Sequence, residues 1–546
     1  MDKAQAPEPI VERLRSNLRA AGIRFTEADI QGILEQGFLR TVAAFEAILE
    51  RTPVKPIPDY LDFWEGPASE DVRARPEPPG SAEQGVAQGT DTDRRDATIG
   101  AIAERIRRRE VSPVELTERA LARIAERDPI LNAFQLVLAE PARTAARHAE
   151  REIAAGIYRG PLHGVPIAVK DLLAMAGTPT TAGSKILAGW VTDFDATAVE
   201  RLVSAGAVIV GKTRLSEFAY SPGSNNPHYG PTRNPHDLER DTGGSSSGSA
   251  AAVADGLVYG ALGTDTGGSI RIPAALCGIV GLKPTYGRIS LHGVVPLAWS
   301  LDHLGPMTRS VADAALMLAA LAGPDPRDPR TRRAPPPVPS WLDGIGGGVK
   351  GLRIGVLRND GSGGVTGTPA ALDAWHAGLA VLERAGAELV EIAVPELADL
   401  WILNSAILAA EAAAYHEPML RARPTDFGPF VFQRLLTSYA YGPGAFVRAQ
   451  QARAALRHRC AALFEHIDLL STPAQPDAAP SLGTPAWTRL TGPFNILGWP
   501  AISVPVGTTA DGLPLGLQLI GRPWDEATVL RAAWAIETGL AHAPRR

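Results

Sequence analysis

Apolar residues recur at helical spacing near the start of the chain. Residues 9–51 contain two such patterns. In the second, from Glu27 to Arg51, the apolar side chains are Ile30, Ile33, Leu34, Phe38, Leu39, Val42, Phe45 and Leu49. Because an apolar helical face must be covered by something, we predict a helical segment that packs on the rest of the chain or mediates homodimer contacts.

The composition changes after this segment. Residues 52–95 contain the prolines 53, 56, 58, 67, 76, 78 and 79, followed by many Gly, Gln, Thr and Asp residues. Such a composition is typical of a linker, although Tyr60, Phe63 and Trp64 indicate that its first part docks on another surface. The sequence therefore predicts an N-terminal helical extension with a proline-rich linker over residues 1–95, and a main body over residues 96–546.

Helical patterns and short apolar runs alternate through the main body. Ser112-Pro113-Val114-Glu115 has a capping serine, a proline at the first helical position and a glutamate three residues after the cap. The predicted helices cover residues 113–126, 141–154, 196–205, 369–385 and 526–540, and the predicted strands cover residues 165–169, 207–210 and 353–357. Residues 398–466 read as mostly helical, and residues 324–350 as a surface loop or insertion. This alternation predicts an α/β fold.

Composition and charge narrow the function classes. Apolar residues make up 45% and charged residues 21% of the 546 residues, which is a globular balance, and the formal charge of −5 predicts no nucleic-acid partner. Two cysteines, the lack of an apolar signal core at the start and the lack of a long apolar run predict a cytoplasmic protein without a membrane partner. Because no histidine or cysteine cluster has zinc spacing, neither a metal nor a cofactor is expected.

Lys170 directly follows the apolar run Val165–Val169. Burial penalises the charged form of a lysine, so a lysine at this place is suited to act as a base. The alternative is a lysine whose ammonium group reaches out to water at the end of a strand.

Glycine and serine crowd residues 243–249, just before the small apolar run Ala250–Ala254. Gly244 to Gly248 match the pattern G-x-S-x-G, which would make Ser246 a nucleophile, but that pattern requires a preceding strand. The preceding residues 234–242 do not read as a strand, so a plain loop remains the alternative.

A second glycine-rich segment runs from Gly263 to Arg271. Its two adjacent glycines, Gly267 and Gly268, allow backbone amides to approach a ligand closely. Ser269 follows them, so its hydroxyl is placed to attack a carbonyl carbon while these amides stabilise the oxyanion that forms.

Taken together, the three segments resemble the amidase signature family. Their order agrees with the family, as does their spacing of 75 residues from Lys170 to Ser245 and 24 from Ser245 to Ser269. The flanking segments agree as well: Gly281–Thr285, Asp302–Pro306, Asn495–Ala501 and Gly512–Gln518. The resemblance is strong over residues 96–325 and 470–540 and does not reach residues 1–95.

The resemblance implies the amidase signature fold, an α/β fold with a central twisted mixed sheet flanked by helices, here with an extra N-terminal helical segment. It implies that Ser269 is the nucleophile, that Lys170 is the base, and that Ser245, held by a cis peptide bond, relays the proton between them. Further roles are implied for the oxyanion-hole amides of Thr266, Gly267, Gly268 and Ser269, for the substrate-facing carbonyl of Ala219, and for Asp265 and Arg271, which orient the loop.

Two departures from the family pattern stand out: the first concerns the loop of Ser245 and is expected to be tolerated, and the second affects the expected substrate. Ser247 stands where the family usually has glycine, and the segment 220–226 differs from that of glutaminase-like members, which makes glutamine a poor candidate. We expect an amidase that hydrolyses a small amide, urea or carbamate. The alternatives are an amidotransferase component that generates ammonia in a multi-subunit complex, and a binding protein on an inactive scaffold.

Overall fold

A mixed sheet of 11 strands forms the centre of the molecule. The computed structural model describes residues 8–51, 98–336, 340–442 and 444–541. The strands follow the order β1-β3-β2-β6-β8-β7-β12-β13-β11-β9-β10. Their bounds are β1 Phe134–Val137, β2 Pro166–Lys170, β3 Val208–Thr213, β6 Gly260–Asp265, β7 Val280–Lys283, β8 His303–Thr308, β9 Arg353–Asn359, β10 Glu388–Ala393, β11 Leu469–Pro473, β12 Ala501–Thr508 and β13 Pro514–Gly521.

Parallel and antiparallel pairs alternate in blocks across this sheet. β3, β2 and β6 are parallel neighbours, β6 through β11 pair in antiparallel fashion, and β11, β9 and β10 are again parallel. Every residue of β2, β3, β6 and β8 is buried. Because helices cover both faces of the sheet, the side chains on both faces of these strands are buried, and β2 and β3 begin with apolar runs that show no polar alternation.

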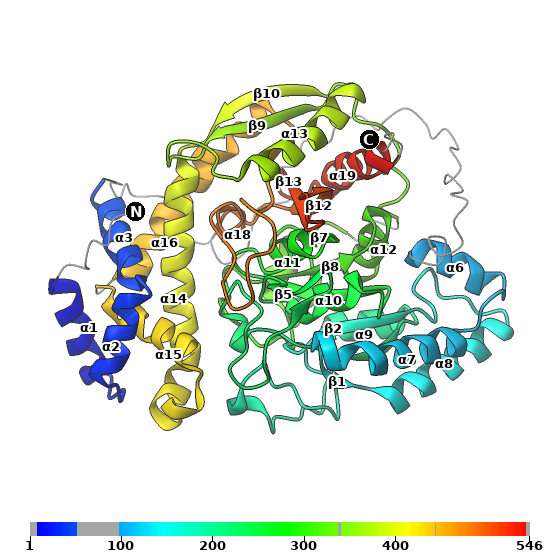
Figure 1. Cartoon of the computed structure of the whole chain (residues 1–546), viewed down its shortest axis with the longest axis horizontal. Helices are drawn as coiled ribbons and strands as arrows, with labels where there is room; N and C mark the ends of the chain where they lie inside the picture. The colour runs from blue at the N-terminus through cyan, green and yellow to red at the C-terminus, as the bar shows by residue number, and fades with distance from the viewer. Residues whose placement is uncertain (1–7, 52–97, 337–339, 443, 542–546) are drawn as a thin grey trace.

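Helices surround the sheet (Figure 1). They are α6 Ile99–Arg107, α7 Pro113–Leu131, α8 Ala139–Ala154, α9 Thr197–Ser204, α10 Ser247–Ala254, α11 Arg271–Leu276, α12 Val311–Leu321, α13 Pro369–Arg384, α14 Glu396–Ala422, α15 Pro429–Leu436, α16 Ala445–Ala461, α17 Leu463–His466, α18 Pro493–Ile496 and α19 Glu526–Ala541. Ser112 caps α7 through the backbone N–H groups of Val114 and Glu115, as its sequence predicts.

The long helix α14 lies between the body and the N-terminal helices (Figure 1). It contacts α18 of the body and α3 (Phe38–Arg51) of the N-terminal segment. Within the described residues it is the one helix long and apolar enough to cross a membrane, but 61% of its most apolar window is buried. The core position of α14 accounts for that composition.

The N-terminal helices α1 (Glu8–Ala20), α2 (Glu27–Glu35) and α3 (Phe38–Arg51) pack on the body. Leu14 and Leu18 of α1 are fully buried. Arg13 donates to the carbonyl of Ala440 at 2.6 Å, and Phe45 meets Tyr441 edge-on at 5.2 Å between ring centroids. Of the two alternatives for this segment, the structure shows packing on the chain itself; a homodimer stays a prediction.

Two sequence predictions need correction. The pattern from Glu27 to Arg51 forms two helices and not one, because the chain turns at Gly37, whose φ of +70° interrupts helical geometry. Residues 237–241, expected to lack strand structure, form β5 (Asp237–Asp241), which pairs with β4 (Arg233–Asn234) in a separate hairpin. The predicted linker, at residues 52–95, lies outside the described residues.

Candidate active site

The predicted catalytic residues meet at one edge of the sheet. β2 and β6 are parallel neighbours, so their carboxyl ends lie side by side. Lys170 is the last residue of β2, and Asp265 is the last residue of β6. Ser269 follows in the turn between β6 and α11, and its residue surface is 9% exposed. This is the edge at which parallel sheets present loops that bind ligands.

Lys170 is fully buried and surrounded by hydroxyl groups. Its Nζ lies 2.8 Å from Ser245 Oγ, 2.9 Å from Ser246 Oγ and 2.8 Å from Thr264 Oγ1. Burial lowers the pKa of Lys170 to about 7, although the negative charges of Asp265 and Asp302 raise it in part. The lysine can therefore be neutral near pH 7, as a base must be.

The hydroxyl partners of Lys170 differ in what they can offer. Ser246 Oγ is 3.2 Å from the carbonyl oxygen of Thr264 and donates its proton there, so toward Lys170 it can only accept. A neutral amine has two protons and one lone pair. If Lys170 gives its protons to Ser246 and Thr264, its lone pair is left for the hydroxyl proton of Ser245. This arrangement suits proton transfer from Ser245 to Lys170.

The loop that carries Ser245 is tightly enclosed. The peptide bond between Gly244 and Ser245 is cis. The N–H of Gly244 donates to Pro222 O at 2.8 Å, and a Cβ added to Gly244 would lie only 2.1 Å from Gly223 O. Ser247, the departure from the family pattern, begins α10 and is fully buried, and its hydroxyl has no partner among the described residues. The Ser247 hydroxyl is not among the hydroxyl groups that contact Lys170.

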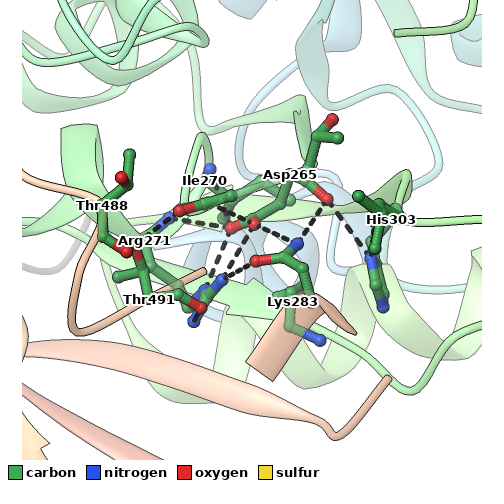
Figure 2. A network of polar contacts seen from close by, with 12 residues as sticks. Asp265, Ile270, Arg271, Lys283, His303, Thr488 and Thr491 are labelled. Carbon is green, nitrogen blue, oxygen red and sulfur yellow. Dashed lines mark hydrogen bonds and ion pairs between the residues drawn. The ribbon is translucent and has the colours of Figure 1, made fainter. Parts of the chain in front are cut away.

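A buried ion pair holds the turn that carries Ser269 (Figure 2). Arg271 Nη2 lies 2.9 Å from Asp265 Oδ1, and Arg271 also donates to Asn495 Oδ1 at 2.7 Å and Gln518 Oε1 at 2.6 Å. Burial alone would raise the pKa of Asp265, but the charge and hydrogen bonds of Arg271 hold it well below its usual range. Asp265 also accepts the backbone N–H groups of Gly268 and Ile270, which fixes the path of the turn.

Two other contacts and one close approach shape the turn. Thr266 Oγ1 donates to Asp302 at 2.6 Å, and Thr491 Oγ1 donates to the carbonyl of Gly267 at 2.6 Å. A Cβ at Gly268, where φ is +133°, would lie 2.3 Å from Thr491 Oγ1, so only glycine fits. The N–H of Gly268 already donates to Asp265. The N–H groups of Thr266, Gly267 and Ser269 are therefore the better candidates for oxyanion donors.

Ala219 lies in a strained segment beside the Ser245 loop. It belongs to the short helix η3 (Glu217–Ala219), in which Phe218 and Ala219 have φ values of +50° and +58°. Consecutive left-handed residues other than glycine are costly and are concentrated at functional sites. The contact between Gly244 and Pro222 brings the chain after Ala219 against the loop of Ser245. A substrate-facing carbonyl at Ala219 stays a prediction.

Ser246, the nucleophile of the competing G-x-S-x-G pattern, is poorly placed for attack. It is fully buried, and its oxygen contacts Lys170, the N–H of Thr264 at 3.3 Å and the carbonyl of Thr264. The β5 strand before it belongs to the outlying hairpin and not to the central sheet. These contacts favour a supporting role for Ser246.

Sequence reasoning missed several residues of the site. Thr264 contacts the lysine, Thr491 holds the turn, and Asn404 reaches Thr266 O from α14 at 3.5 Å. Thr264 lies inside the glycine-rich segment, so a serine or threonine near the lysine could have been suspected. The other two come from remote segments, and nothing in their local sequence marks them.

Comparisons with known proteins agree with this geometry. A family model described as Amidase matches residues 115–530, so the chain belongs to this family. The A subunit of a glutamyl-tRNA(Gln) amidotransferase from Anaeromyxobacter sp. (strain K) is 43% identical over an alignment 484 residues long, which covers 82% of this chain and 96% of the relative. The family predicted from the three motifs is thereby confirmed. Almost the whole relative is covered, so most of the uncovered residues belong to this chain.

Solved structures give the same fold. One, described as "an unexpected vestigial protein complex" that "reveals the evolutionary origins of an s-triazine catabolic enzyme", is 39% identical with a TM-score of 0.77, covering 81% of this chain and 98% of that one. Another, described as an amidase, is 35% identical with a TM-score of 0.72, covering 81% and 99%. The amidase signature fold, with its mixed sheet between helices, is confirmed.

Proposed function

Because the chain belongs to the amidase family, whose enzymes act on carbon–nitrogen bonds, we propose that it cleaves a small carboxamide-type substrate through an ester on Ser269. The observation that carries the proposal is the buried Lys170, with a pKa of about 7, in contact with Ser245 at 2.8 Å. A neutral, positioned base beside a serine relay is what an attacking hydroxyl requires.

The proposed reaction has two halves. Ser269 Oγ attacks the carbonyl carbon as its proton passes to Ser245, while Ser245 gives its own proton to Lys170. The resulting oxyanion is stabilised by backbone N–H groups of the turn, with those of Thr266, Gly267 and Ser269 as the leading donors. Lys170 then returns the proton through Ser245 to the leaving nitrogen, and the C–N bond breaks. Water attacks the ester by the same relay and releases the acid and Ser269.

The comparisons support an ammonia-generating amidotransferase component better than a free-standing amidase. Relatives at 41 to 43% identity carry the name of the A subunit of glutamyl-tRNA(Gln) amidotransferase. In that function the chain would release ammonia from an amide donor and work with partner proteins. Glutamine, disfavoured by the segment 220–226, therefore returns as the first substrate to test.

A free-standing amidase remains the second candidate. A specific observation favours it: solved structures similar to this chain are described as an amidase and as a peptide amidase, at 35% and 32% identity. In this function the substrate would be a small amide, urea or carbamate. A cytoplasmic location, and a homodimer, belong to the same proposal.

Labelling with a reactive fluorophosphonate, followed by peptide mapping, tests the nucleophile. We expect modification at Ser269, hydroxamate product when hydroxylamine is present, and very low turnover for Ser269→Ala. Ser246→Ala serves as the comparison, and it should keep measurable activity because its hydroxyl supports the site without attacking. Modification of Ser246, with Ser269 untouched, would show that the wrong serine has been assigned.

A second experiment separates the two candidates. Ammonia release by the purified chain is measured with L-glutamine and with a panel of amides, ureas and carbamates. Turnover of glutamine, with little turnover of the panel, supports the amidotransferase component. Efficient turnover of a panel member without glutamine hydrolysis supports the free-standing amidase. If protein that the fluorophosphonate can label turns over neither set, both candidates fail.

A further inference from the structure

The carboxamide of Asn404 lies beside the turn that carries the nucleophile. Asn404 belongs to α14, and only 4% of its surface is exposed. Its Nδ2 lies 3.5 Å from the carbonyl oxygen of Thr266, a long hydrogen bond. Since a carbonyl oxygen can only accept, this contact directs the amide nitrogen toward the turn and leaves Oδ1 on the other side.

Oδ1 of Asn404 has no hydrogen-bond partner in the part of the chain that the structure describes. Buried polar atoms in folded proteins are nearly always paired, because an unpaired one forfeits its bonds to water. The Nδ2 contact does not satisfy this oxygen. A donor that arrives with the substrate would complete the pairing.

The position of the Asn404 carboxamide relative to the turn indicates which part of the substrate supplies the donor for Oδ1. A Cβ built on Gly267 or on Gly492 would in each case lie 3.6 Å from Asn404 Nδ2. The Asn404 side chain therefore packs between the turn and the start of α18. Ser245 and Lys170 reach the turn from the start of α10 and from β2 instead. The leaving nitrogen must face Ser245 to receive its proton, so the retained acyl part of the substrate is the part available to Asn404.

We propose that Asn404 is a specificity-determining residue that accepts a hydrogen bond from an N–H or O–H group of the acyl part, within two bonds of the scissile carbonyl carbon. The inference rests on the proposed function in its free-standing amidase form and deepens it, since the carbons next to the side-chain carboxamide of glutamine carry no such group. The substrate class that fits is a urea-type compound, or an amide with an amino or hydroxyl group on the carbon next to its carbonyl. A purely aliphatic acyl group leaves Oδ1 unpaired.

Neighbouring contacts make α14 a rigid carrier for this side chain. Trp401 Nε1, about one helical turn earlier, donates to Thr488 Oγ1 at 2.9 Å. Further along the helix, Glu411 accepts the N–H and the hydroxyl of Ser300 at 2.9 and 2.6 Å. Because both ends of this stretch are fixed to loops around the site, Asn404 is held in place before any substrate binds.

Two probes that differ by one group test the proposal. Butyramide and ethylurea have the same shape, but ethylurea has an N–H where butyramide has a methylene group next to the carbonyl. The full-length chain and its Asn404→Leu variant are assayed for kcat and KM with each probe. We expect Asn404→Leu to lower kcat/KM for ethylurea by about tenfold or more, and that for butyramide by about twofold at most.

A matched control lies one residue along the same helix. Ser405 is partly exposed and its hydroxyl donates to Trp401 O at 3.1 Å, so Ser405→Ala should leave the ratio of the two probes unchanged. Asn404→Ala, which also removes the acceptor, replaces Asn404→Leu if the larger apolar side chain prevents folding. Thermal unfolding of each variant separates a loss of stability from a loss of recognition.

The outcomes distinguish this inference from the proposed function. An equal loss with both probes, or turnover of butyramide without turnover of ethylurea, would overturn the role of Asn404 while leaving the proposed function intact. In the first case Oδ1 is met by water or serves packing alone. If the wild-type chain turns over neither probe nor any other amide or urea, the proposed function fails, and the inference fails with it.

Discussion

The sharpest prediction concerns the protonation of Lys170. Burial lowers its pKa to about 7. Only the neutral lysine can accept a proton, so kcat/KM should fall as pH decreases through this value. With a pKa of about 7, about nine-tenths of the lysine is neutral at pH 8 and about one-tenth at pH 6, so the rate should drop about tenfold between them.

Replacing the lysine should remove both the rate and its pH dependence. Lys170→Met keeps most of the side-chain length and loses the base, so we expect kcat to fall by about 10²- to 10⁴-fold, the usual contribution of general-base catalysis. Any residual rate should no longer change between about pH 6 and 8 in the manner of the wild type. The assay is ammonia release under kcat/KM conditions from about pH 5.5 to 9, a range that brackets the inflection, with circular dichroism to confirm folding.

A second buried group titrates in the same range and provides the control. Burial raises the pKa of Glu537 on α19 to about 7, and its carboxylate accepts the N–H of Val311 at 3.0 Å, in contacts separate from those of Lys170. Glu537→Gln should therefore keep the inflection if Lys170 causes it. A fully active Lys170→Met variant, or an inflection that disappears in Glu537→Gln and persists in Lys170→Met, would refute the assignment of the base.

Three further predictions follow from the fold and the site. Arg271→Leu should destabilise the protein by about 3–5 kcal/mol in chemical denaturation, because it leaves the charge of Asp265 buried without its ion-pair partner; an unchanged unfolding midpoint would contradict this. A version starting near Asp96 lacks α1–α3 and exposes apolar surface on α14 and α15, so light scattering should detect aggregation or a new oligomeric state, whereas unchanged scattering and stability would argue against the packing role. Activity should survive EDTA, since the described residues contain no group of three or more His, Cys, Asp or Glu suited to a metal; loss restored by zinc or manganese would overturn the serine–lysine assignment.

Local sequence determined the outline of the catalytic body. Apolar runs predicted β2 and α13 to within a residue, and the capping signal predicted the start of α7, although this helix continues to Leu131 and not only to Glu126. Burial and capping act over short distances along the chain, so local sequence reveals them. The ordered glycine- and serine-rich segments identified the family, which the comparisons confirm. They also placed Lys170, Ser245 and Ser269 as candidates, of which the structure shows the first two in contact.

Tertiary structure decided what neither periodicity nor motif contains. Gly37 divides the pattern from Glu27 to Arg51 into two helices, and an apolar stripe does not reveal such a break. The partners of the turn, Thr491 and Asn404, lie far from Ser269 in sequence, and their own segments carry no chemical signature.

The pKa of Lys170 is another property that the tertiary structure decides and the local sequence does not. The sequence placed a lysine after an apolar strand and left two outcomes open, a charged group reaching water or a buried base. Full burial beneath the loop of Ser245 and beside Thr264 selects the second, because desolvation acts through every segment packed around the amine. Sequence thus determined which groups are present, while packing determined their protonation and the neighbours that Lys170 and Asn404 acquire.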